Sequence, residues 1–152
     1  MTKQNQKAII EKINELYIMT RFKYLVQFPG GKYATLDQRK DKRIILLNDG
    51  FIKSHLEGER TYGVFSGGYF SKFITFDIDC EGHDETARWA VYKIINILTA
   101  EHNIMRNDIH VSTSGGKGYH VDLFFDRPVL VEDLRKFYTA VVTEVGPLPV
   151  GK

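Results

Sequence analysis

Residues 72–79 read Lys-Phe-Ile-Thr-Phe-Asp-Ile-Asp, and this stretch sets the fold of the second half of the chain. Its apolar and polar side chains alternate, as they do along a β-strand that is buried on one face. The alternation places Thr75, Asp77 and Asp79 on one face and isoleucine and phenylalanine on the other. We therefore expect a strand that buries its apolar face and presents two neighbouring carboxylates on the other.

A helix is expected directly after this strand. Asp84 can act as its N-cap, and the helix should run to about His102 because apolar residues recur at every third or fourth position. The recurring apolar residues are Ala87, Val91, Ile94, Ile95 and Leu98. This spacing predicts a helix that buries one stripe against the strand.

Two further strands and a helix complete the predicted second half. Strands are expected over 109–113 and 119–125, joined by a loop over 114–118, with Asp126-Arg127-Pro128 ending the second strand. A last helix is expected over 132–145. The order strand, helix, strand, strand, helix is that of a split β-α-β unit, in which a fourth strand should follow. The chain stops at Lys152, so we expect the unit to be one strand short.

The sequence pattern of the first half predicts a smaller α/β unit. Because helices and antiparallel strands are expected in both halves, the predicted fold class is α+β. We expect one domain over 1–152, with a helical and hairpin subregion over 1–60 and a second subregion over 61–152. The elements expected before residue 72 are a helix over 3–20, strands over 24–28, 32–36 and 62–65, and a short helix between a turn at 48–50 and Gly58.

The composition fits a single globular domain. The chain has 152 residues, of which 43% are hydrophobic and 26% are charged. Cys80 is the only cysteine, so no internal disulfide can form. No apolar run approaches the roughly 20 residues that span a bilayer, and the polar N-terminus is unlike a signal peptide. We expect a cytoplasmic protein that does not bind membranes.

Charge is distributed unevenly along the chain. Between Arg21 and Arg43 there are seven Lys or Arg residues and two Asp residues. Between Asp77 and Glu85 there are five acidic residues and no Lys or Arg. A protein that holds a polyanion together with a divalent cation needs both kinds of region, although two solvated surface segments would show the same pattern.

Asp77 and Asp79 are the strongest candidates for chemistry. Two carboxylates side by side on a strand repel each other unless a cation lies between them. Mg²⁺ or Mn²⁺, held by carboxylates together with substrate phosphates, is the usual solution. The alternative is a solvated strand end that carries an acidic turn.

A glycine-rich segment provides a candidate phosphate site. It comprises Ser114, Gly115, Gly116, Lys117 and Gly118, and His120 follows at the start of the next strand. Glycines allow close backbone approach to an anion, lysine supplies charge, and serine and histidine supply side-chain donors. The alternative is a flexible connection that contains a lysine by chance.

Three further residues each have two candidate roles. His120 can donate to a phosphate or a leaving group, or be a hydrogen-bonded structural residue. Asp122 can orient His120 or act as a further metal ligand. Tyr69 can stack on a base if it is exposed, or belong to the core.

These segments resemble the first two signatures of the archaeo-eukaryotic primase superfamily, the primase-polymerases. The signatures are a hydrophobic-Asp-x-Asp strand, here Phe76–Asp79, and Ser-Gly-x-x-Gly-x-His, here Ser114–His120. The upstream runs His55–Gly58 and Tyr62–Phe65 are similar to the branch found in mobile elements and TOTE conflict systems. The resemblance covers about residues 50–145.

The resemblance implies a nucleotidyltransferase, a DNA primase or polymerase, built on an RNA-recognition-like sheet beside the N-terminal α/β unit. Asp77 and Asp79 would bind Mg²⁺ or Mn²⁺, and Ser114, Lys117 and His120 would hold the phosphates of the incoming nucleotide. The implied partners are nucleoside triphosphates and a single-stranded or primed template, with a helicase as a further candidate.

One departure from the family pattern affects the expected activity. The family carries a third carboxylate on a strand after the second helix, and Glu144 is a poor substitute for it. We therefore expect this chain to bind nucleotide and to polymerise weakly or not at all. The competing hypotheses are an inactive module that binds nucleotide or single-stranded nucleic acid, and a metal-dependent phosphohydrolase or nuclease.

Overall fold

A computed structural model describes residues 3–80, 82–114 and 118–149. The chain divides into two compact units, Met1–Phe70 and Ser71–Lys152. The predicted subregions, 1–60 and 61–152, place this division earlier. It lies later because residues 61–64 form a strand that pairs within the first sheet.

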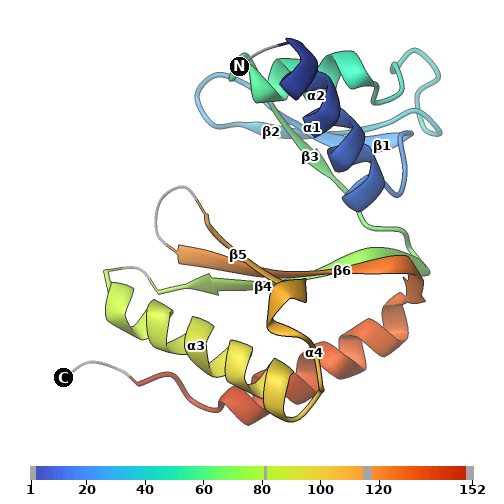
Figure 1. The fold of residues 1–152 in the computed structure, drawn as a ribbon. Helices are drawn as coiled ribbons and strands as arrows, with labels where there is room; N and C mark the ends of the chain where they lie inside the picture. The colour runs from blue at the N-terminus through green and yellow to red at the C-terminus, as the bar shows by residue number, and fades with distance from the viewer. Residues whose placement is uncertain (1–2, 81, 115–117, 150–152) are drawn as a thin grey trace. The chain divides into compact units, whose positions relative to one another are not determined.

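The first unit is a three-stranded antiparallel sheet with two helices (Figure 1). Strand β1 lies in the middle of the sheet and pairs with β2 on one side and β3 on the other. In chain order the elements are α1 (Lys3–Leu16), β1 (Lys23–Gln27), β2 (Tyr33–Asp37), α2 (Asp49–Leu56) and β3 (Thr61–Val64).

Two local features of the first unit follow from single residues. The turn between β1 and β2 contains Gly30 and Gly31 at φ 86° and 80°, a region that glycine enters without steric cost. The turn predicted at 48–50 is instead the start of α2. The Asn48 side chain accepts hydrogen bonds from the N–H groups of Gly50 and Phe51, so it caps the helix.

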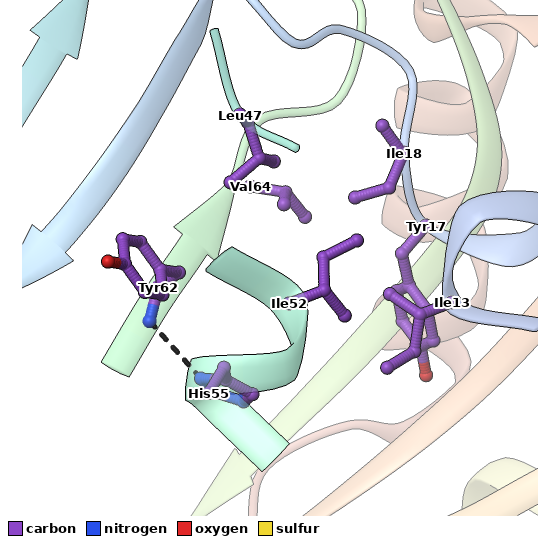
Figure 2. Close-up of a pocket in the computed structure, with 8 residues that line it drawn as sticks. All are labelled: Ile13, Tyr17, Ile18, Leu47, Ile52, His55, Tyr62 and Val64. Atoms are coloured by element: carbon purple, nitrogen blue, oxygen red, sulfur yellow. Dashed lines mark hydrogen bonds between the residues drawn. The ribbon is translucent and has the colours of Figure 1, made fainter. Parts of the chain in front are cut away.

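The core of the first unit is small and leaves an apolar pocket. Its fully buried apolar side chains are Tyr24, Val26, Leu47 and Ile52. A pocket of about 230 Å³ opens among residues of α1, α2 and β3, whereas α1 itself has no fully buried residue (Figure 2). The residues that line this pocket are Ile13, Tyr17, Ile18, Leu47, Ile52, His55, Tyr62 and Val64.

The second unit is a sheet of three strands, among the described residues, with two helices on one face (Figure 1). The strand order is β4-β6-β5, so β6 lies between the two strands that helix α3 connects, as the split β-α-β order predicts. In chain order the elements are β4 (Phe70–Asp79), α3 (Asp84–Ala100), η1 (Arg106–Asp108), β5 (Ile109–Thr113), β6 (Gly118–Leu130) and α4 (Val131–Val145).

The apolar face of β4 lies in the main core, as its alternation predicts. Phe76 and Ile78 are 1% and 7% exposed, whereas Asp77 and Asp79 are exposed. Phe76 stacks on Tyr138 of α4 with ring centroids 5.1 Å apart. The five apolar residues expected on the stripe of α3 are all buried: Ala87, Val91, Ile94, Ile95 and Leu98.

Two predictions about the ends of elements were wrong. The N-cap of α3 is His83, which makes no side-chain capping bond, and Asp84 is the first helical residue. Asp84 is instead engaged by Tyr119. Strand β6 continues through Pro128 to Leu130. Its pairing with β5 ends at Leu123, so proline interrupts no bond in that ladder.

Truncation of Leu98 tests the core of the second unit. This residue is 0% exposed on α3, so Leu98→Ala should lower the free energy of unfolding by about 2–5 kcal/mol through lost burial and a cavity. Urea denaturation followed by the fluorescence of Trp89, the only tryptophan, measures the change. Val142→Ala on α4 is the control, since Val142 is 43% exposed and should cost much less. Equal losses in both variants would contradict this description of the core.

Candidate metal and phosphate site

The face of the second sheet opposite α3 and α4 carries the predicted site residues, and we call it the site face. Asp77 and Asp79 lie on it because Phe76 and Ile78 occupy the helix-covered face of the same strand. On β6, Val121 and Leu123 are buried in the core, so His120 and Asp122 lie on the site face. Alternation along two adjacent strands therefore brings both signatures to one surface.

Asp77 and His120 are in direct contact. His120 Nε2 lies 3.4 Å from Asp77 Oδ1, and the Asp77 side chain is 69% exposed. Across the hairpin, His120 pairs in register with Ser112 of β5. The imidazole is thus placed between a carboxylate and a serine on the site face.

Gly118 packs against the end of the carboxylate strand. A Cβ atom at this position would lie 2.0 Å from the carbonyl oxygen of Ile78 and 3.2 Å from the Cα of Asp79. Only glycine fits at such distances without movement of the backbone. The base of the glycine-rich segment is thereby held directly beside Asp79.

The glycine-rich segment is described only at its two ends. The N–H of Ser114 donates to the carbonyl oxygen of Gly118 at 2.9 Å, which closes the hairpin between β5 and β6. Gly115, Gly116 and Lys117 lie outside the described residues. Their phosphate-binding role stays a prediction.

Asp122 is hydrogen-bonded to Thr75, whereas the sequence analysis considered His120 or a metal ion as its partner. It is 7% exposed, and its Oδ1 accepts a hydrogen bond of 2.5 Å from the hydroxyl of Thr75 on β4. This bond joins β4 to β6 on the site face. Thr75 was placed on this face by the alternation, but its pairing with Asp122 spans 47 residues and has no local signal in the sequence.

Glu144 lies away from the two aspartates. It belongs to α4, which packs on the helix-covered face of the sheet, and its Oε1 is 3.8 Å from Nε2 of His102. Within the described residues, no group of three His, Cys, Asp or Glu side chains is placed to hold a metal ion. Asp77 and Asp79 therefore stand as a pair of carboxylates, and substrate oxygens would have to complete the coordination of a hard cation.

The basic segment of the first unit is partly occupied by internal contacts. Arg39 donates through its backbone N–H, Nε and Nη2 to Asp37, and these bonds hold the pKa of Asp37 below its ordinary value. Arg43 pairs with Asp41 in the same way, and Arg21 donates to Asn14 and to the carbonyl of Leu47. Three of the seven Lys and Arg residues between Arg21 and Arg43 are therefore engaged in these contacts within the first unit.

Two other sequence features have a definite position. The runs His55–Gly58 and Tyr62–Phe65 meet in the first unit, where the N–H of Tyr62 donates to Nδ1 of His55 at 3.2 Å (Figure 2). Tyr69 is 83% exposed, which stacking on a base would require. No helix in the described part of the chain is both long and apolar enough to cross a membrane.

Comparison with known proteins gives one family. The family model described as "TOTE conflict system, Archaeo-Eukaryotic Primase domain" matches residues 13–148, which is most of the chain. No curated protein matches the sequence.

The close approach of Gly118 to β4 can be tested by adding one methyl group. Gly118→Ala should lower the free energy of unfolding of the second unit by about 1–3 kcal/mol, because the carbonyl of Ile78 must move. Gly68→Ala is the control, since no heavy atom of the described residues beyond its chain neighbours lies within 4 Å of the Cβ position there. Urea denaturation followed by Trp89 fluorescence measures both, and an unaffected Gly118→Ala variant would contradict the contact.

Proposed function

The chain belongs to the archaeo-eukaryotic primase domain family of TOTE conflict systems, and from this we propose that its site face binds a metal–nucleotide complex for nucleotidyl transfer. The observation that carries the proposal is the contact between the two signatures. Asp77 and His120 lie 3.4 Å apart, and Gly118 packs on the backbone of Ile78 and Asp79. This contact supports the proposal because the proposed metal ligands and the proposed phosphate donor lie side by side.

The residues present suit Mg²⁺ or Mn²⁺ as a cofactor. Asp77 and Asp79 offer exposed carboxylate oxygens on successive site-face positions of one strand, and these cations prefer oxygen ligands. Mg²⁺ in particular binds one or two protein carboxylates together with substrate phosphates. When bound, the cation would neutralise the phosphate charge and polarise the α-phosphate.

The chain's own side chains have separate tasks in this proposal. His120 lies beside Asp77, with Nε2 3.4 Å from Asp77 Oδ1, so its imidazole can donate a hydrogen bond to a phosphate oxygen of a nucleotide bound at these aspartates. Ser114 supplies a hydroxyl donor at the other end of the glycine-rich segment. In the reaction, a 3′-hydroxyl oxygen bonds to the α-phosphorus and its proton passes to solvent. The bond between the α-phosphorus and the oxygen bridging to the β-phosphate breaks, so pyrophosphate leaves and the nucleotide stays joined to the 3′ end.

The proposed partners are nucleoside triphosphates, a single-stranded or primed template and a helicase. The first unit supplies cations for a template backbone, including Lys32, Lys40 and Lys42, although three arginines of the same segment are engaged in internal pairs. Exposed Tyr69 offers a ring for stacking. Template binding in this proposal depends on lysines and aromatic rings more than on the arginines.

A second candidate function is nucleotide binding without transfer. The observation that favours it is the state of Asp122, because this further carboxylate of the site face is buried and already bonded by Thr75. Oδ1 of Asp122 is therefore already engaged, and the buried side chain is poorly accessible to a second cation. A domain with this arrangement would bind nucleotide through Asp77 and Asp79 and depend on another acid for efficient transfer.

Replacement of the two carboxylates tests the metal assignment. Asp77→Asn and Asp79→Asn should each weaken Mn²⁺-dependent binding of a deoxynucleoside triphosphate by roughly 10-fold or more, because a charged ligand is lost. Isothermal titration with and without Mn²⁺ measures this. Asp108→Asn in η1 is the matched control and should bind as the unchanged chain does. Undiminished binding by both site variants would refute the assignment.

An extension assay separates the candidate activities. The chain is incubated with a primed template, labelled nucleoside triphosphates and Mn²⁺. Extended products that disappear in Asp77→Asn support nucleotidyl transfer, and binding without products supports the second candidate. Released phosphate or cut strands would instead indicate a phosphohydrolase or nuclease, with water in place of the 3′-hydroxyl.

A further inference from the structure

The side chains of Tyr119, Asp84 and Arg88 form one hydrogen-bonded group next to the candidate site. The hydroxyl of Tyr119 donates to Oδ1 of Asp84 at 2.8 Å, and Nε of Arg88 lies 2.8 Å from Oδ2 of the same carboxylate. Both oxygens of Asp84 are therefore engaged. A hydrogen bond with Tyr119 and the charge of Asp84 raise the pKa of Arg88, so its guanidinium stays charged.

The group connects the two segments that carry the signatures. Tyr119 lies in β6 between Gly118 and His120, and its ring packs against the main core. Asp84 is the first residue of α3, which begins shortly after the carboxylate strand ends at Asp79. A bond between Tyr119 and Asp84 therefore fixes the start of β6 to the chain that follows the aspartates.

Stability alone does not explain such a group. The side chains of Arg88 and Asp84 are 64% and 60% exposed, and ion pairs this exposed contribute little to folding. The hydroxyl of Tyr119, however, is held in one direction by a charged acceptor. The expected consequence is local order beside the site, with little effect on unfolding.

We infer that Asp84, Arg88 and Tyr119 are positioning residues that hold Ser114, Gly118 and His120 in place relative to Asp77 and Asp79. This inference rests on the proposed function, since its benefit is a preformed site for the phosphates of the nucleotide. Preformed geometry lowers the entropy lost on binding. Nucleotide affinity should therefore depend on a hydroxyl that does not itself contact the nucleotide.

Removal of this hydroxyl tests the inference. Tyr119→Phe keeps the ring in the core and should weaken Mn²⁺-dependent binding of a deoxynucleoside triphosphate by about 3- to 10-fold, the range of one lost hydrogen bond. The urea midpoint should fall by no more than the loss of one hydrogen bond allows. Tyr92→Phe is the control, because it removes a hydroxyl from a 63% exposed tyrosine of α3. Asp84→Asn keeps an acceptor for Tyr119 and should bind more tightly than Asp84→Ala.

Hydrogen exchange without nucleotide separates this inference from the proposed function. Tyr119→Phe should speed exchange at the N–H of Ser114, which bonds to Gly118. Faster exchange together with weaker nucleotide binding supports the positioning role. Unchanged exchange overturns it, and so does faster exchange with unchanged affinity. If the unchanged chain binds no nucleotide, the proposed function fails, and the positioning role fails with it. Hydrogen exchange would still report whether the bond between Tyr119 and Asp84 orders the start of β6.

Discussion

The packing of Phe76 is the interaction on which the second unit depends. Its ring is 1% exposed, stacks on Tyr138 and meets Phe137 edge-on with centroids 6.3 Å apart. Because side chains of a strand alternate, burial of this one ring turns Asp77 and Asp79 away from the helices. A one-residue change of register would bury both carboxylates at a large cost in desolvation, so the apolar core and the placement of the site have one cause.

Much of this unit could be predicted from the sequence, because its signals are local. Alternation in 72–79 and the three-to-four spacing on α3 correctly placed the strand, the helix and the buried stripe. Two predictions about element ends failed, one of them at a residue whose side chain a distant residue engages. Asp84 was expected to cap α3 but is held by Tyr119, and the segment 126–128 was expected to end a strand that continues beyond its pairing with β5. Contacts across 35 or 47 residues have no periodic signature.

In the candidate site, too, local patterns could be predicted from the sequence and long-range contacts could not. The sequence alone grouped Asp77, Asp79, Ser114 and His120, since each belongs to a short pattern of residue types suited to metal or phosphate. The bond between Thr75 and Asp122 could not be anticipated, and it changes the interpretation of Asp122 from a free ligand to a buried acceptor. The basic segment is also visible in the sequence, but only the structure shows that Arg39 and Arg43 each pair with an aspartate two residues earlier, Asp37 and Asp41.

Gly118 also limits which side chains fit at the start of β6. Every other amino acid would add at least a Cβ atom 2.0 Å from the carbonyl of Ile78, so no substitution at this position is sterically neutral. At Gly68, no atom of the described residues beyond its chain neighbours lies within 4 Å of the Cβ position, so an alanine fits there without a clash. The two glycines therefore differ in the side chains that fit at their positions, and Gly118 marks where the glycine-rich segment lies directly against the carboxylate strand.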